Sequence, residues 1–305
     1  HIDMGSWKKI DEVPFDFERR RVSVLIDNGA TRWLVVKGAP DDIVGLCARY
    51  EANGAGDERA IDEAALAAIR AQYHALETDG LRVLGIAWRQ VAPERAHAMV
   101  GDETELVLAG FACFLDPPKA SAAPALEALA RLGVAIKVVT GDSELVTRHV
   151  CAQLGIPVRG MLTGGEIARM EDHALRVRVA TANLFCRINP AEKNRVILAL
   201  KARGHVLGYL GDGVNDAPSL HSADVGLSVD SAADVAKEAA DMILLEPDLN
   251  VLHAAVLEGR RTFGNIMKYI MMGTSSNFGN MFSMAGAALF LPFLPMLPAQ
   301  ILLNN

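Results

Sequence analysis

Between Leu106 and about Leu252, short apolar segments alternate with polar turns and amphipathic segments, and this order constrains the fold more than any other feature. The apolar segments have the length of strands, and the segments between them have helical periodicity. Parallel strands need long crossover connections, usually helices, so this order predicts an α/β domain built on a parallel sheet. The predicted strands are Val107–Phe114, Ala135–Val139, Leu184–Arg187, Val206–Leu210, Val225–Leu227 and Met242–Leu245.

Residues 1–105 have a different pattern. Two strand-like runs, Val22–Ile26 and Trp33–Val36, flank Asp27-Asn28-Gly29. An Asn-Gly pair between such runs is a strong signal for a β-hairpin. A helical segment over Ile61–Leu76 and a strand over Arg82–Trp88 follow. This region is therefore predicted to be α+β, and it contains no obvious acid/base pair.

The charged residues stop at Lys268. All 30 Lys and Arg and all 37 Asp and Glu lie at or before it, so the last 37 residues carry no charge. A helix crosses a bilayer with about 20 predominantly apolar residues, so this segment predicts a transmembrane helix. Arg260 and Arg261 would keep its N-terminal side in the cytosol. Three prolines in Leu291–Pro298 predict a turn, with a second membrane helix starting over Ala299–Asn305.

The charge of the chain argues against a nucleic-acid partner, and the spacing of its cysteines argues against a zinc site. The formal net charge is −7, and the only dense basic run is Arg19-Arg20-Arg21. A nucleic-acid surface needs clustered Lys and Arg, so no nucleic-acid partner is predicted. The cysteines form no CxxC pair and have no His at zinc-ligand spacing, so we interpret them as reduced thiols. They are Cys47, Cys113, Cys151 and Cys186.

Polar residues follow three of the predicted parallel strands, where α/β sheets collect their chemistry. One such segment is Gly211-Asp212-Gly213-Val214-Asn215-Asp216. Its carboxylate and amide oxygens suit a hard cation such as Mg²⁺, with Asp212 and Asp216 as metal ligands. The alternative is an ordinary turn, because turns are rich in Asp and Gly.

The other two strand ends carry a hydroxyl and a lysine. Thr140-Gly141-Asp142 offers an oxygen donor and backbone N–H groups at a helix start, which suits an anion. Thr and Asp also cap helices, so an N-cap is the alternative. Lys193 follows Pro190 on the first turn of a predicted helix, where the helix dipole disfavours a cation. A bound phosphate would explain this lysine, and a solvated surface position is the alternative.

Together these three strand ends resemble the haloacid-dehalogenase-like phosphotransferase core, and Gly211–Pro218 (GDGVNDAP) resembles the matching motif of P-type ATPases. Asp116-Pro117-Pro118-Lys119 is similar to the hinge motif of that family, and Lys37-Gly38-Ala39-Pro40 to its nucleotide motif. Pro14–Ser23 and Ser275–Asn280 most resemble bacterial magnesium-transporting P-type ATPases. The order of the motifs agrees over nearly the whole chain.

The resemblance implies three regions: residues 1–105 as the C-terminal part of a nucleotide-binding domain, 106–252 as a haloacid-dehalogenase-like phosphorylation domain, and 253–305 as a stalk, transmembrane helix 5 and the start of helix 6. It implies an ATP-driven cation pump of the cell membrane, most similar to those for Mg²⁺, working through an aspartyl-phosphate. ATP and Mg²⁺ would be its cofactors. Its partners would be the transported cation, the lipid bilayer and the rest of the parent chain.

The same resemblance implies the roles of individual residues. Phe15 would stack on adenine, and cations would meet the phosphates. The nucleotide set is Phe15, Arg20, Lys37, Gly38, Arg82 and Asp116. The phosphoryl-transfer set is Thr140, Gly141, Asp142, Lys193, Asn215 and Asp216, with Asp212 and Asp216 on the metal. Asn277 and Asn280 would meet the transported ion, and hydrogen bonding between membrane helices is the alternative for them.

One motif of the family does not occur. The phosphorylated aspartate of P-type ATPases stands in a DKTGT motif, which this sequence lacks. Asp116 is followed by two prolines, which offer no backbone N–H donors to a phosphoryl group. We therefore expect a piece of a longer pump that binds nucleotide and is inactive alone. The alternatives are a calcium or proton pump, a phosphatase of the same superfamily, and a membrane-tethered nucleotide-binding module.

Overall fold

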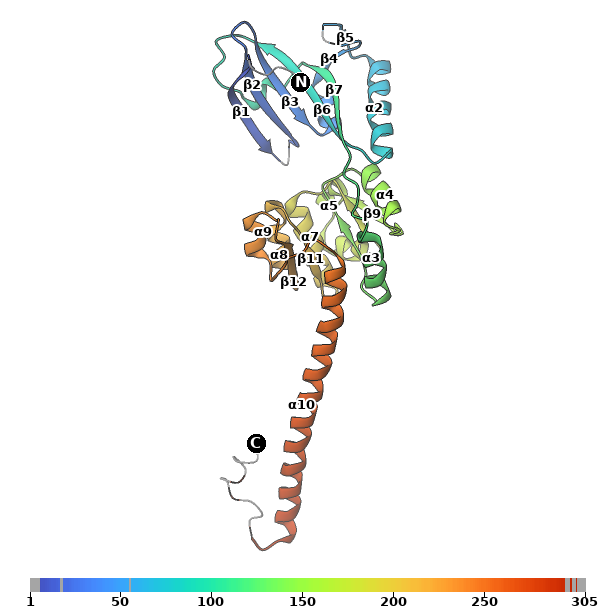
Figure 1. Cartoon of the computed structure of the whole chain (residues 1–305), viewed down its shortest axis with the longest axis vertical. Helices are drawn as coiled ribbons and strands as arrows, with labels where there is room; N and C mark the ends of the chain where they lie inside the picture. The colour runs from blue at the N-terminus through green and yellow to red at the C-terminus, as the bar shows by residue number, and fades with distance from the viewer. Residues whose placement is uncertain (1–5, 17–18, 55, 294–296, 298–299, 301–305) are drawn as a thin grey trace. The chain divides into compact units, whose positions relative to one another are not determined.

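The computed structural model describes residues 6–16, 19–54, 56–293, 297 and 300 (Figure 1). The chain divides into two units, His1–Pro247 and Asp248–Asn305. Within the first unit we distinguish the sheet lobe, residues 6–114, from the parallel lobe, residues 122–247.

The sheet lobe is built on a seven-stranded sheet of order β1-β2-β3-β6-β7-β4-β5. Neighbouring strands pair antiparallel, except that β4 and β7 are parallel. The strands are β1 (Lys8–Asp16), β2 (Arg21–Asp27), β3 (Arg32–Gly38), β4 (Cys47–Glu51), β5 (Glu58–Ala60), β6 (Arg82–Val91) and β7 (Leu106–Phe114).

One face of this sheet is covered by α1 (Pro40–Val44) and α2 (Glu63–Thr78). Because strand side chains alternate between faces, Leu25, Leu34 and Ala87 all point to this side, where they pack with Ile43 and Ile69. The predicted hairpin is confirmed, since β2 and β3 pair antiparallel from Arg21↔Gly38 to Asp27↔Arg32. A short 3₁₀ helix, Val100–Asp102, precedes β7.

All three tryptophans of the chain form one stack in the sheet lobe. The ring centroids of Trp7 and Trp33 lie 4.9 Å apart, as do those of Trp33 and Trp88. The Trp88 Nε1 donates to Glu51 Oε1 at 2.9 Å, so its one polar atom is satisfied. Each of the three residues is half-buried.

The parallel lobe contains two three-stranded parallel sheets, of order β8-β10-β9 and β11-β12-β13. Their strands are β8 (Val138–Val139), β9 (Met161–Thr163), β10 (Leu184–Cys186), β11 (Gly208–Leu210), β12 (Val225–Val229) and β13 (Met242–Leu244). The helices are α3 (Ala122–Arg131), α4 (Glu144–Gln153), α5 (Gly164–Arg169), α6 (Asp172–Thr181), α7 (Pro190–Lys201), α8 (Ala217–Ser222) and α9 (Asp234–Ala239), with a 3₁₀ helix, η2 (Val214–Asp216). Leu162, Phe185 and Val196 belong to one core cluster, Tyr209, Leu220 and Ala236 to a second, and Cys151, Leu184 and Cys186 form a smaller third.

The structure corrects the sequence prediction for this sheet in two ways. Val107–Phe114 is a strand, but it does not belong to the predicted parallel sheet: β7 lies in the sheet lobe, antiparallel to β6 and parallel to β4. Leu106, Val107 and Leu108 are consecutive buried residues, a pattern that also suits a parallel strand. The other five predicted strands are parallel, yet within the described residues they form two sheets instead of one. The apolar pattern predicts that a segment is a strand. Which strands lie beside it depends on tertiary packing.

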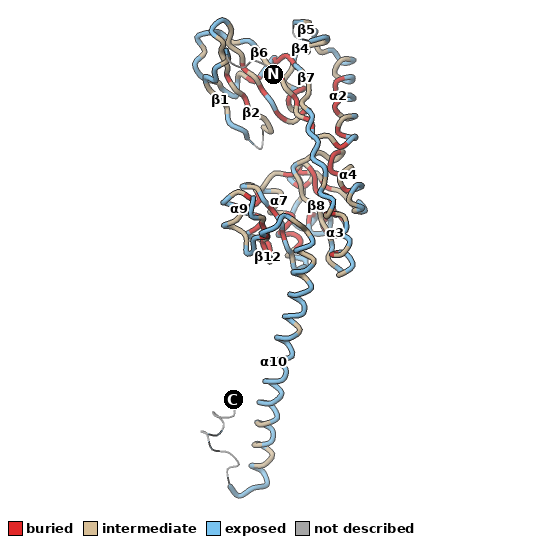
Figure 2. The backbone as a smooth tube through the Cα atoms, viewed as in Figure 1, coloured by how far each residue is buried: buried red, intermediate tan, exposed pale blue. Residues whose placement is uncertain are grey.

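The second unit contains α10 (Asn250–Phe290), a helix of 41 residues with no buried position (Figure 2). Among the described residues, no helix combines the length and the hydropathy that a bilayer crossing requires. The predicted transmembrane helix is therefore not found among the described residues. The absence of charge does not make the segment apolar enough, because polar side chains interrupt it. Among them are Thr274, Ser275, Ser276, Asn277, Asn280 and Ser283.

Three other predictions concern the same end of the chain. Asn277 is exposed and Asn280 half-buried on α10. The predicted turn over Leu291–Pro298 lies partly outside the described residues, and the predicted start of a second membrane helix, Ala299–Asn305, lies outside them apart from Gln300. The four cysteines are free thiols, as predicted.

Candidate functional site

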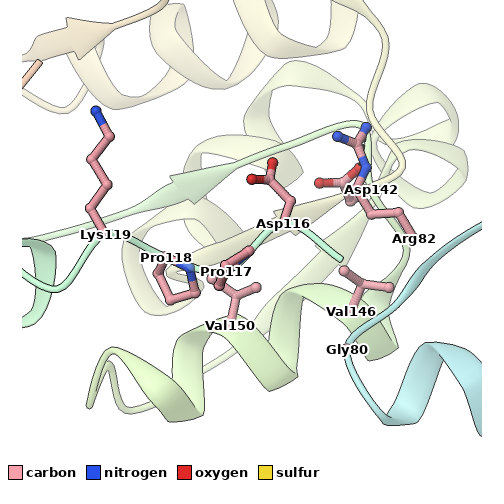
Figure 3. A pocket seen from close by; sticks show the side chains of 9 residues that line it. All are labelled: Gly80, Arg82, Asp116, Pro117, Pro118, Lys119, Asp142, Val146 and Val150. Atoms are coloured by element: carbon pink, nitrogen blue, oxygen red, sulfur yellow. Dashed lines mark ion pairs between the residues drawn. The ribbon is translucent and has the colours of Figure 1, made fainter. Parts of the chain in front are cut away.

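A cleft of about 330 Å³ brings together residues from both lobes of the first unit (Figure 3). Arg82 comes from the start of β6, Asp116 follows β7, and Asp142 follows β8. Both polar and apolar side chains, including two prolines, line the cleft. The lining residues are Gly80, Arg82, Asp116, Pro117, Pro118, Lys119, Asp142, Val146 and Val150.

An ion pair crosses this cleft. The Arg82 Nη2 lies 3.1 Å from Asp142 Oδ1, and the two side chains are 55% and 34% exposed. Pairs this exposed contribute about 0–1 kcal/mol, because water screens them. The Arg82 guanidinium is therefore held at low cost and can exchange its carboxylate for an anionic ligand.

The Thr140-Gly141-Asp142 segment forms the turn between β8 and α4. The Asp142 N–H donates to Thr140 Oγ1 at 3.1 Å, and this hydroxyl donates to Asp142 Oδ2 at 3.2 Å. The N-cap alternative fails, because the cap of α4 is Ser143, whose side chain accepts from the Val146 N–H. Gly141 is exposed, so its backbone is accessible to a ligand. The geometry is therefore compatible with an anion-binding role for this turn.

Lys193 and Asp216 form a largely buried pair in the parallel lobe. The Lys193 Nζ donates to Asp216 Oδ1 at 2.8 Å, and the Tyr209 hydroxyl donates to the same oxygen at 2.8 Å. The Gly213 N–H donates to Asp216 Oδ2 at 3.2 Å. Burial raises the pKa of Asp216, but these hydrogen bonds outweigh it, so the pKa lies below its ordinary value. Asp216 is therefore ionised at neutral pH, and Lys193 is not a freely solvated surface residue.

Gly211 makes room for this pair. A Cβ at Gly211 would lie 2.6 Å from the Asp216 Cβ and 2.9 Å from its carboxyl carbon. Real Cβ atoms essentially never approach so closely, so a side chain here must displace Asp216. The first glycine of the GDG sequence is thus required by packing.

We expect Gly211→Ala to break the Lys193–Asp216 hydrogen bond and to cost about 1–3 kcal/mol of stability through overpacking. Urea unfolding of the purified chain measures this loss. Gly213→Ala is the matched control, because the nearest atom to its Cβ would lie 3.5 Å away, in ordinary contact. Equal stability of the two variants would contradict the packing argument.

The structure divides the predicted metal ligands. Both Asp216 oxygens are engaged by Lys193, Tyr209 and Gly213, whereas Asp212 is exposed. Over the described ranges, no group of three or more His, Cys, Asp or Glu side chains is placed to hold a metal ion. Mg²⁺ usually keeps several waters and needs one or two carboxylates beside phosphate oxygens. Asp212 fits that requirement as a single open carboxylate, and Asn215 lies half-buried three residues later.

The remaining nucleotide residues lie elsewhere in the sheet lobe. Phe15 on β1 is 53% exposed, Lys37 on β3 is exposed and Gly38 is buried. Arg20 lies between β1 and β2 in the left-handed region, with φ of 51°. Of the six predicted nucleotide residues, the cleft collects Arg82 and Asp116 and none of the other four.

Comparison with known proteins decides the family. Residues 4–121 match the family described as P-type ATPase, cytoplasmic domain N. The chain is 47% identical, over 99% of its length, to the "Magnesium-transporting ATPase, P-type 1" of Salmonella typhimurium, and 46% identical, over 98%, to that of Escherichia coli K12. The "Probable cation-transporting ATPase F" of Mycobacterium tuberculosis is 35% identical over 97% of the chain.

The chain belongs to the P-type ATPase family. It spans about a third of the length of each of these relatives, since the matched region is 33% of each. The resemblance predicted from the GDGVNDAP, KGAP and DPPK segments is confirmed at the level of the family.

In this P-type ATPase chain, the residues predicted for phosphoryl transfer lie in two groups. Thr140 and Asp142 bond to each other and, through Asp142, to Arg82. Lys193, Tyr209 and Asp216 bond among themselves. Within the described part of the chain, no hydrogen bond or ion pair joins the side chains of the two groups. The fold therefore presents two polar strand ends without a direct link between them.

Sequence reasoning missed one charged centre of the P-type ATPase chain, at Glu103. This residue is 1% exposed and accepts from three side chains. Arg19 Nη1 donates to it at 2.8 Å, Arg21 Nε at 2.6 Å and Ser23 Oγ at 2.5 Å. Burial raises the pKa of Glu103, but these three bonds bring it below its ordinary value. A lone Glu before a strand gives no sequence signal of this kind, and the basic run was the only hint.

Proposed function

We propose that this chain forms the ATP-binding and phosphoryl-handling part of a magnesium-transporting P-type ATPase of the cell membrane. The observation that carries the proposal is the cleft, which gathers Arg82, Asp116 and Asp142 from separate strand ends. The names of the relatives at 46–47% identity support Mg²⁺ as the transported cation.

The side chains of the cleft suit a polyphosphate. Arg82 supplies positive charge beside Asp142, and Pro117 and Pro118 supply apolar surface without N–H donors. Lys119 also lines the cleft, with its ammonium donating to the Pro247 carbonyl at 2.9 Å. ATP approaching the cleft would compete with Asp142 for the Arg82 guanidinium, at the low cost argued for an exposed pair. Phe15, which is exposed on β1, offers an aromatic face to adenine.

The parallel lobe would handle the transferred phosphoryl group. Phosphoryl transfer is promoted mainly by positioning and charge neutralisation. Thr140 and the Gly141 N–H offer donors, while Lys193 offers a positive charge that is held by Asp216, which in turn accepts from Tyr209. Mg²⁺, with Asp212 as its open carboxylate, would neutralise phosphate charge when bound. The phosphorylated aspartate would come from another part of the pump, since this sequence has no DKTGT motif.

The proposal is tested by ATP binding to the purified chain in the presence of Mg²⁺, measured by isothermal titration calorimetry. We expect Arg82→Ala to weaken binding at least tenfold, because it removes a phosphate-facing cation. Arg59→Ala is the matched control: Arg59 has the same 55% side-chain exposure and also pairs with an aspartate, Asp57. No detectable ATP binding by the unmodified chain, or equal affinities for the two variants, would contradict the proposal.

The same sample tests whether the phosphorylated aspartate lies outside this chain. Incubation with ATP labelled on its γ-phosphate should leave no acid-stable, hydroxylamine-sensitive label on the chain. Such a label would show that a residue of this chain forms an acyl phosphate, and the proposed absence of the nucleophile would be wrong.

A further inference from the structure

We propose that Arg187 is a clasp that joins the sheet lobe to the parallel lobe and sets their relative position. Arg187 follows β10 directly and belongs to neither of the residue sets predicted for nucleotide or phosphoryl transfer. Both its side chain and its backbone make contacts that cross from one lobe to the other.

The guanidinium of Arg187 bridges two carboxylates. Its Nη1 lies 2.8 Å from Asp41 Oδ2, on α1 of the sheet lobe. Its Nε lies 2.8 Å from Glu144 Oε2, on α4 of the parallel lobe. Arg offers several N–H donors in a fixed planar fork, so one side chain can hold two acceptors in a defined geometry. A lysine has a single ammonium group and cannot reproduce that geometry.

The backbone of Arg187 is held from the same two sides. Its carbonyl accepts from Arg20 Nη2 of the sheet lobe at 2.8 Å. Its N–H donates to the Asp142 carbonyl at 2.9 Å, in the turn that carries Thr140. Arg187 therefore connects α1, which contains Asp41, with the candidate phosphate-binding turn.

The backbone conformation at this contact is unfavourable. Arg187 and Arg20 both have φ of 51°, and Glu105 is the one other non-glycine residue of the described ranges with positive φ. Left-handed conformations are unfavourable for a non-glycine residue, because its Cβ approaches the following carbonyl oxygen. Such outliers persist where the surroundings fix them, and they gather at sites that carry function. Here the two strained residues bond directly to each other.

The partners of the clasp are themselves fixed. The other oxygen of Asp41 accepts from the hydroxyl of Tyr73, which is fully buried on α2. On the opposite side, Gly164 lies under the Arg187 carbonyl, because a Cβ there would be 2.3 Å from this oxygen. Asp41 and the Arg187 backbone therefore cannot turn away independently, and separation of the lobes must break the ion pair.

The ion pair between Arg187 and Asp41 can hold the lobes together and can also break. The Arg187 and Asp41 side chains are 26% and 39% exposed, so water and salt screen the pair in part. The inference rests on the proposed function, because the predicted nucleotide and phosphoryl-transfer residues lie on the two lobes that Arg187 joins. Arg187 would then be a positioning residue that brings bound ATP towards Thr140 and Asp142.

The clasp is tested on the whole chain without nucleotide by hydrogen–deuterium exchange. In Arg187→Met, the amides of α1 should exchange at least fivefold faster, although α1 lies in the other lobe. In Asp41→Asn, whose side chain still accepts from Tyr73, residues 187–189 should show the reciprocal increase. The double variant should add little to either. Unchanged exchange of α1 in Arg187→Met would overturn the clasp.

Arg195→Met is the matched control for that experiment. Arg195 also bonds two carbonyls and a carboxylate, but all three lie within the parallel lobe: Ile167 O, Met170 O and Asp172 Oδ1. It should leave α1 exchange unchanged. A rise at α1 equal to that of Arg187→Met would indicate general destabilisation and would overturn the assignment to Arg187.

The positioning role is tested in the full-length pump. Arg187→Met should raise the KM for ATP at least fivefold and lower kcat by a smaller factor, and Arg187→Lys should restore little of either. An unchanged KM beside altered α1 exchange would overturn the positioning role. Failure of the proposed function is distinguishable, because it would appear as absent ATP binding in the unmodified chain.

Discussion

Glu103→Ala is expected to lower the free energy of unfolding by about 3–5 kcal/mol, the usual cost of removing one partner from a buried ion pair. The Glu103 carboxylate is fully buried and accepts from Arg19, Arg21 and Ser23. Its removal leaves two largely buried guanidinium groups without a counter-charge. It also releases the segment that leads into β2, which carries Arg20. Urea unfolding at pH 7 measures the loss.

The loss should depend on pH in a defined direction. The pKa of Glu103 is lowered by folding, so its stabilising contribution is complete above the ordinary value of about 4.3 and is lost as pH falls through the lowered value. The difference between the unmodified chain and Glu103→Ala should therefore shrink below about pH 4.3. Glu58→Ala is the control, because Glu58 pairs with the half-exposed Arg49 and should cost at most about 1 kcal/mol. Equal costs for the two variants would contradict the argument.

Gly38→Ala should cost about 3 kcal/mol or more, at the upper end of what overpacking does, because the clash is with backbone. A Cβ at Gly38 would lie 2.4 Å from the Arg20 carbonyl oxygen and 2.9 Å from the Arg21 Cα. The same carbonyl accepts from the Ala39 N–H at 3.1 Å, so the strand end cannot move without losing that bond. Lys37 precedes the clash, and we expect ATP affinity to fall at least tenfold as well.

Gly101→Ala separates this clash from a general effect of replacing glycine. No atom lies within 4 Å of the Cβ position at Gly101, and this glycine is also in the sheet lobe. Its cost should be at most about 1 kcal/mol. If Gly38→Ala unfolds at the same urea concentration as Gly101→Ala and binds ATP equally well, the close approach at Arg20 is not what constrains the KGAP glycine.

The sequence alone predicted the type of most elements and the identity of the family, but not the partners of the strands. The Asp27-Asn28-Gly29 hairpin and the five parallel strands follow from local patterns of two to eight residues. The placement of β7 depends on which strands lie beside it in three dimensions. Three consecutive buried residues suit a strand of either sheet. Likewise, the uncharged C-terminal segment suggested a membrane span, whereas hydropathy depends also on the Ser, Thr and Asn residues within it.

For the candidate site, the sequence patterns identified individual residues, and the structure shows which of them contact one another. The motifs named Lys193 and Asp216 separately, and the fold makes them a hydrogen-bonded pair that includes Tyr209. No pattern assigned a role to Glu103 or Arg187, since both act through partners at least 40 residues away in the chain. Long-range contacts of single charged residues leave no periodicity in a sequence. They become visible only when the partners have been placed.

The tryptophan stack gives the two lobes separate optical signals. Because Trp7, Trp33 and Trp88 all lie in the sheet lobe, intrinsic tryptophan emission reports the unfolding of that lobe alone. Most of the helices lie outside it, so far-ultraviolet circular dichroism at 222 nm is weighted towards the rest of the chain. Coincident transitions by the two probes would mean that the lobes unfold as one cooperative unit. Separate transitions would give the stability of each lobe without cutting the chain.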